Sequence, residues 1–185
     1  MREDDIRMLP AGSHFNFKGF EWIALDNNVD GGVLAVMTSS WNGEKYRFDE
    51  GCCGNYAKSS LRRKLLNELL PTLGEDNLIP HEVDLVADNG DDRYGKVSDK
   101  VFILSCDEYR KYRKNVPLLP EWMWTCTPWY ITDAGGSIIV RCVGTDGSLH
   151  GNDAYYTYGV LPVCIFNPEK VKIEYQFANV KEKTE

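Results

Sequence analysis

The chain lacks long hydrophobic runs and any concentration of positive charge. No apolar segment approaches the roughly 18 residues that a membrane-spanning helix requires, although 43% of its 185 residues are hydrophobic. Its formal net charge is -7, and an acidic surface repels the phosphates of nucleic acids and of anionic membranes. The densest basic cluster, Arg62-Arg63-Lys64, is too short to form a basic stripe. We therefore expect neither nucleic acid nor a membrane surface as the partner.

Motifs of the common catalytic and cofactor classes are also missing. The three histidines, His14, His81 and His150, are scattered and no Cys-x-x-Cys occurs, which excludes the usual zinc patterns. Neither the Gly-x-Gly-x-x-Gly nor the Gly-Lys-Ser/Thr phosphate-binding motif is present. The Gly-x-Ser-x-Gly motif of serine hydrolases is absent as well. We expect no cofactor, no metal ion and no catalytic residue.

Nor does the sequence begin like that of an exported protein. Residues 1–10 are charged and lack the apolar stretch of a secretory signal, so we expect a cytoplasmic or virion-associated protein. The six cysteines are too few for a dense disulfide framework, and several lie within apolar strand patterns. We expect free thiols, including Cys52 and Cys53, because a disulfide between adjacent residues would be strained.

What the chain has in abundance is the pattern of short β-strands. Segments rich in aromatic and β-branched residues are bounded by turn-forming Gly, Asp and Asn. Residues 122–128, 137–143 and 158–166 are predicted to form three consecutive strands of one antiparallel sheet. Further strands are predicted as an opening hairpin at 15–25 and 33–38, a buried strand at 100–104, and a strand at 171–177 that pairs within the domain or with another copy. The interval 39–55 is predicted to be loop.

Two helices are predicted. Residues 59–70 carry a stripe of leucines opposite a basic face, which we expect to be solvated rather than to bind an anion. Pro71 should end this helix, since the residue before a proline is pushed out of the helical region. The second helix is predicted at 107–115, where Ser105 and Glu108 can form a capping box.

The loops between the last strands combine aromatic rings with short polar side chains. Aromatic residues offer large contact areas at low entropic cost, and Asn, Asp and Ser supply hydrogen bonds, which is the chemistry of a binding surface. The alternative is that several of these rings simply cover the sheet. Asp153 lies in the same interval. The candidate ligand-binding residues are Trp129, Tyr130, Asp133, Asp146, His150, Asn152, Tyr155, Tyr156 and Tyr158.

Four short motifs, in order along the chain, resemble those of a family of uncharacterised domains from gut bacteria and their phages. Residues 59–67 resemble its "Ser-x-Ile-Arg-x-Trp-Leu-Asn" helix, and residues 99–105 its "Asp-Lys-Val-Phe-Leu-Leu-Ser" strand. Residues 123–128 are similar to its "Trp-Trp-Leu-Arg-Ser-Pro", and residues 159–163 to its "Gly-Val-Arg-Pro-Ala". The resemblance covers most of the chain from about Phe15 to Phe166.

This resemblance implies an α+β fold of the C-type-lectin-like kind, related to formylglycine-generating enzymes and phage receptor-binding proteins. Two main helices would pack around a small twisted antiparallel sheet with long irregular loops. The domain would be single, spanning 1–185, with a core at about 15–166 and a C-terminal strand or tail at 167–185. Two family arginines correspond to Cys126 and Leu161 here, which favours apolar repacking at those positions.

The resulting hypothesis is a non-enzymatic binding module of phage origin. It would recognise a protein or glycan surface through the late loops, because these form the ligand face in the implied fold. One alternative is an enzyme of the formylglycine-generating group that uses Cys126 as its thiol, although the expected cysteine pair has no counterpart. Another is a structural virion or assembly subunit, and a homo-oligomer is compatible with each of these.

Overall fold

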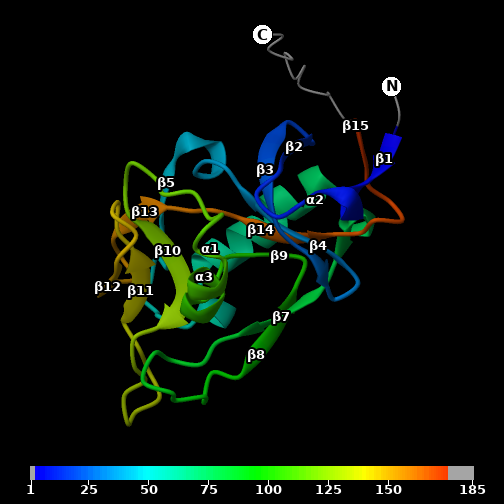
Figure 1. Ribbon diagram of the computed structural model, residues 1–185. Helices are drawn as coiled ribbons and strands as arrows, with labels where there is room; N and C mark the ends of the chain where they lie inside the picture. The colour runs from blue at the N-terminus through cyan, green and yellow to red at the C-terminus, as the bar shows by residue number, and fades with distance from the viewer. Residues whose placement is uncertain (1–2, 175–185) are drawn as a thin grey trace, which may run out of the picture.

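The computed structural model describes residues 3–174, and in this part of the chain β-strands dominate (Figure 1). The strands form four sheets, two of them large and two of only two strands. In Figure 1 the five-stranded sheet lies to the left and most of the six-stranded sheet to the right. The buried side chains of both sheets join in one hydrophobic core.

The six-stranded sheet is built around two strands that bury every residue, β4 and β14. Strands β3 and β4 pair antiparallel, which confirms the predicted opening hairpin in part. The single strand predicted at 15–25 is wrong, because a turn at Lys18-Gly19 divides it into β2 and β3, which pair with each other. The turn between β3 and β4 is Asp30-Gly31, and both residues have positive φ (49° and 82°), as a two-residue hairpin turn requires. The strands are β2 (His14–Phe17), β3 (Phe20–Val29), β4 (Gly32–Met37), β14 (Val163–Phe166), β6 (Leu78–Ile79) and, paired with β14, β9 (Val101–Phe102).

The five-stranded sheet has the order β12-β11-β10-β13-β5. Strands β10 and β11 pair antiparallel, as predicted, but β10 and β13 pair in parallel where Met123 lies opposite Gly159. The prediction of a single strand at 158–166 is wrong, because the chain changes sheets around Pro162 and continues as β14. The strands are β12 (Leu149–Asp153), β11 (Ile139–Val143), β10 (Met123–Pro128), β13 (Thr157–Gly159) and β5 (Lys45–Arg47).

The predicted fold of two main helices around a small sheet is wrong. In the described part of the chain, one helical segment is longer than two turns; it runs through α1 (Ser60–Lys64), a π-helical turn (Leu65–Leu69) and α2 (Leu70–Leu73). The second helix, α3 (Cys106–Tyr112), has the predicted capping box but only 7 residues. The sheets, rather than the helices, form the framework of the molecule.

The first helix passes Pro71, contrary to the prediction that it ends there. The Leu70 N–H bonds to the Leu65 carbonyl, five residues back, so the turn before the proline is widened. A widened turn accommodates a residue that has no N–H to donate. The helix ends instead at Gly74, whose φ of 83° lies in the left-handed region.

The basic face of this helix is not entirely solvated. Arg62 makes a two-pronged salt bridge with Asp99, with Nε–Oδ2 at 2.8 Å and Nη2–Oδ1 at 2.7 Å. The Asp99 side chain is 1% exposed and that of Arg62 is 23% exposed. The Arg62 Nη1 also donates to the Ala57 carbonyl. This pair ties the helix to β8 (Lys96–Asp99), whose last residue is Asp99.

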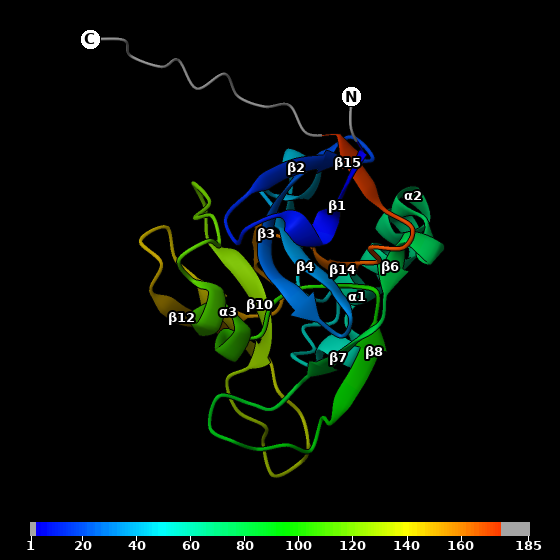
Figure 2. The same ribbon diagram turned by 45° about the vertical axis from the view of Figure 1, so that its right-hand side comes forward.

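The smaller sheets complete the structure. Strands β7 (His81–Asp84) and β8 (Lys96–Asp99) form a hairpin, and β1 (Glu3–Asp5) pairs with β15 (Lys172–Glu174) at the top of both ribbon views (Figure 2). Part of the strand predicted at 171–177 lies outside the described residues. Single-turn helices occur at Ile6–Met8, Trp41–Gly43, Tyr56–Lys58 and Glu75–Asn77. No helix in the described range is long and apolar enough to cross a membrane.

Candidate functional site

Two of the nine predicted binding residues lie on β12, one on β13, and the others in the connections around these strands. The structure brings four of them together: His150, Asn152, Tyr156 and Tyr158. Trp122, which sequence reasoning did not select, joins them from the position just before β10. We name Trp122, His150, Tyr156 and Tyr158 the aromatic cluster. The period-2 spacing of Trp122 and Trp124 could have indicated that both rings lie on one face of the sheet.

Strand register explains why these side chains meet. His150 lies opposite Cys142 and Cys142 opposite Trp124, so their side chains share one face of the sheet. Asn152 follows His150 by two positions and therefore has the same orientation. The ring of Tyr158 packs 4.6 Å from that of Trp124, which places it on this face too.

Within the cluster the rings form two nearly parallel pairs. Trp122 and His150 stack at 4.4 Å with an angle of 17° between their planes, and Tyr156 and Tyr158 lie 6.4 Å apart at 12°. The Asn152 amide donates to the Tyr158 hydroxyl at 2.5 Å. Burial raises the pKa of Tyr158, so its hydroxyl stays protonated. Tyr156 is 54% exposed, so the cluster presents an aromatic surface to solvent, and the more buried Tyr158 packs against its inner side.

His150 is fixed by a chain of polar contacts. Its Nε2 lies 2.7 Å from the Ser148 Oγ, and Ser148 donates both its N–H and its hydroxyl to Asp146 Oδ1. These bonds from Ser148 lower the pKa of Asp146. Because the carboxylate accepts the serine proton, the hydroxyl must accept from the His150 Nε2–H. The arrangement orients the imidazole, whereas a catalytic triad would place the carboxylate on the histidine.

The remaining predicted residues lie apart from the cluster. Trp129 packs on the opposite face of the sheet, over Gly151, where an added Cβ would come within 2.2 Å of the indole. Arg141 lies against the same ring at 5.1 Å. The Arg47 guanidinium lies over the Tyr155 ring at 4.0 Å, and Tyr155 is 51% exposed. Asp133 and Tyr130 are exposed in the loop after β10.

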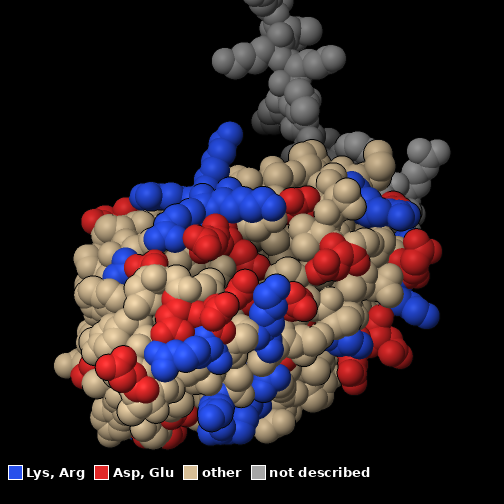
Figure 3. Space-filling model, turned by 90° about the horizontal axis from the view of Figure 1, so that it is seen from below, with Lys and Arg blue, Asp and Glu red and all other residues tan. Residues whose placement is uncertain are grey.

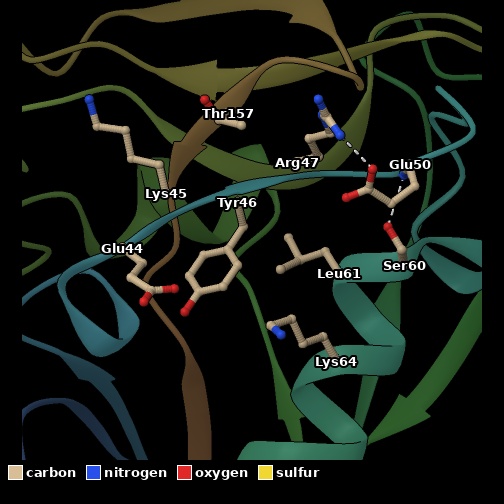
Figure 4. A pocket seen from close by; sticks show the side chains of 9 residues that line it. All are labelled: Glu44, Lys45, Tyr46, Arg47, Glu50, Ser60, Leu61, Lys64 and Thr157. Atoms are coloured by element: carbon tan, nitrogen blue, oxygen red, sulfur yellow. Dashed lines mark hydrogen bonds and ion pairs between the residues drawn. The ribbon is translucent and has the colours of Figure 1, made fainter.

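A groove of about 420 Å³ lies beside β5, in a region predicted to be loop (Figure 4). Tyr46 points into it toward Leu61 and Lys64 of α1, while Lys45 and Arg47 leave the strand on the other side. Burial raises the pKa of Tyr46 to about 12. The alternation of charged, aromatic and charged residues at 45–47 was the signal for this strand, but three residues are too few to establish a period. The groove is lined by Glu44, Lys45, Tyr46, Arg47, Glu50, Ser60, Leu61, Lys64 and Thr157.

A second cavity, of about 540 Å³, lies between the β7–β8 hairpin and the start of α3. Its lining has five carboxylates, two basic side chains and His81, so the cavity is acidic although several of these groups form ion pairs with one another. Seen from below, the side of the molecule that β7 and β8 occupy carries acidic and basic side chains interspersed (Figure 3). Ion pairs around the cavity are His81–Glu108 (2.9 Å), Lys96–Glu82 (2.7 Å), Arg110–Asp107 (2.9 Å) and Arg110–Asp88 (3.5 Å).

The cysteines are free thiols, as expected. Cys126 is fully buried, and burial raises its pKa well above that of an ordinary thiol. A nucleophilic cysteine requires the opposite shift, together with access to a substrate. Burial likewise raises the pKa of Cys142, to about 12. The enzyme hypothesis based on the Cys126 thiol therefore has no physical support at that residue.

Comparison with protein-family models, curated proteins and solved structures returned no match. Within residues 3–174, no three His, Cys, Asp or Glu side chains converge where a metal ion could be held. A function can therefore be inferred only from the chemistry of the surfaces, chiefly the aromatic cluster and the β5 groove.

Proposed function

We propose that this protein is a non-enzymatic binding module that recognises a glycan surface through the aromatic cluster. One observation supports this most strongly: rings from β10, β12 and the β13 region form near-parallel pairs on one face, with Tyr156 more than half exposed. His150 and Tyr158 project from strands β12 and β13, Trp122 directly precedes β10, and Tyr156 lies in the short turn between β12 and β13. Such preorganisation reduces the entropy lost on binding.

The chemistry of the cluster suits a sugar. A pyranose ring presents flat C–H faces that stack on aromatic rings, and its hydroxyls need nearby donors and acceptors. Here His150 and Asn152 supply polar atoms at the margin of the rings, and both are oriented by bonds to Ser148 and Tyr158. The surface therefore combines apolar contact with directed hydrogen bonds.

The motif resemblance favours a phage-related origin, so glycans of bacterial surfaces are the first ligands to screen. A cytoplasmic or virion-associated location remains part of this proposal. A structural virion subunit is the competing assignment. It predicts stable assembly of the purified chain and no glycan binding.

The test is a glycan-array screen, followed by titration calorimetry of any ligand found. Tyr156→Ala should weaken binding about 5- to 30-fold, as removal of one stacking ring typically costs about 1–2 kcal/mol. The control is Tyr130→Ala, which removes a tyrosine of similar exposure (40%) from outside the cluster. Equal loss of affinity in both variants, or a fall in melting temperature that accounts for the loss, would refute the assignment.

A further inference from the structure

Strand β5 ends the five-stranded sheet, and the orientation of its backbone follows from one hydrogen bond. Gly159 donates its N–H to the Trp122 carbonyl, just before β10. The N–H and C=O groups of Gly159 therefore point toward β10 and away from β5. In an antiparallel ladder, residue pairs with and without mutual hydrogen bonds alternate. The bonded pair is therefore Tyr46–Tyr158, whose residues lie opposite each other. It follows that Lys45 and Arg47 turn their N–H and C=O groups outward.

These outward N–H and C=O groups of Lys45 and Arg47 are free to form hydrogen bonds. Neither backbone group of Lys45 or Arg47 makes a hydrogen bond outside the ladder with any residue in the range 3–174. The groove beside α1 is lined by both residues (Figure 4). A sheet edge with unpaired donors and acceptors is a template for an added strand, and peptide-binding domains use such edges.

Side chains along the edge define what would fit. Lys45 and Arg47 lie on one face of β5. Lys45 has no ion pair with any described residue, whereas Arg47 already pairs with Glu50 at 2.7 Å, so an acidic partner would compete with Glu50 there. On the other face Tyr46, with Leu61 behind it, offers an apolar contact. We propose that this edge binds an extended polypeptide segment with the pattern acidic–apolar–acidic, as a sixth strand of the sheet. Its acidic side chains pair across the strands with Lys45 and Arg47, and its apolar side chain contacts Tyr46.

A second copy of β5 does not meet this requirement. A two-fold antiparallel pairing centred on Tyr46 would place Lys45 opposite Arg47 of the other copy. Like charges directly opposite each other destabilise a strand pair. The two cations therefore act against self-association while they favour an acidic partner, as charged edge residues do in other sheets.

The experiment is an NMR titration of the ¹⁵N-labelled full chain with short peptides. The probe is Thr-Glu-Val-Glu-Thr, and the comparison peptide is Thr-Lys-Val-Lys-Thr. We expect the acidic peptide to shift the amide signals of residues 45–47 and the lysine peptide to have no effect at the same concentration. Two acidic peptides N-methylated at alternate residues should differ, because only one set of N–H groups faces β5. The peptide whose methyl groups point away from β5 should bind like the parent peptide, and the peptide whose methyl groups replace the bonding N–H groups should not bind.

Charge reversal supplies the matched variant. Lys45→Glu replaces an attractive cross-strand pair by a repulsive one, so affinity for the acidic peptide should fall about 2- to 30-fold. Lys114→Glu makes the same change at another exposed lysine and should have no effect. The proposal is overturned if the peptide shifts signals elsewhere but not at 45–47, if both N-methylated peptides behave alike, or if no peptide binds at millimolar concentration. None of these results bears on glycan binding at Tyr156.

Discussion

Removal of Arg62 should cost far more stability than removal of its neighbour on the same helix. In Arg62→Met, the Asp99 carboxylate would remain 99% buried without its two charged hydrogen bonds. Breaking a buried pair from one side typically costs about 3–5 kcal/mol. Arg63 is 60% exposed, and Arg63→Met should change the free energy of unfolding by less than about 0.5 kcal/mol.

The cost should also depend on which partner is removed. In Asp99→Asn the remaining Arg62 keeps its bond to the Ala57 carbonyl and is 23% exposed, so it can recover some hydration. We expect a loss of about 1–3 kcal/mol for this variant. The double variant Arg62→Met/Asp99→Leu leaves no unpaired charge and should be more stable than Arg62→Met alone.

Urea denaturation followed by circular dichroism measures these differences. The slope against urea should be the same in all variants, so that the midpoints report stability alone. A loss below about 1 kcal/mol for Arg62→Met would match an exposed ion pair and would refute the reasoning. Equal losses of stability in Arg62→Met and Asp99→Asn would also refute it, because the unpaired group left behind is more deeply buried when it is Asp99 than when it is Arg62.

Three further predictions concern buried polar groups. The Tyr56 hydroxyl is buried and has no hydrogen-bond partner among residues 3–174, so Tyr56→Phe should leave stability unchanged or raise it by up to about 1–3 kcal/mol in the same urea assay. Bonds to Glu108 and Asp30 raise the pKa of His81 above 6.5, so the stability it adds is fully present below pH 6.5 and is lost as the pH rises through the folded-state pKa. Denaturation from pH 5.5 to 8.5 should show His81→Gln less stable than the parent at the acidic end, with the gap closing toward alkaline pH; a constant gap would contradict this. Cys126 should resist iodoacetamide in the native protein and react after unfolding, and rapid native labelling seen by mass spectrometry would disprove its burial.

The sequence predicted local structure better than it predicted how the pieces combine. Alternation identified the β3–β4 hairpin, and the leucine stripe identified the first helix, because both patterns depend on neighbours along the chain. The two-helix, C-type-lectin-like fold came from short motifs, which say nothing about sheet order. The change of sheets near Pro162 and the parallel contact of Met123 with Gly159 are set by distant packing.

The candidate site was predicted in part for the same reason. His150, Asn152 and Tyr158 meet because strand register aligns them, but Trp129 was assigned to the same surface and lies on the opposite one. Gly151 explains this difference, since its missing side chain makes room for the indole on the far face. A sequence pattern marks residues that can bind a ligand, whereas the face each residue occupies depends on register that only the structure supplies.

The pairing of β1 with β15 has a consequence for how the chain can be rearranged. Glu3 lies opposite Glu174, so the first and last described strands run side by side in opposite directions. A short linker could join them while new ends are opened at an exposed turn such as the one at Gly90. Such a circular permutant would retain every strand pairing of the described structure, and both new termini would lie far along the chain from the aromatic cluster and from β5.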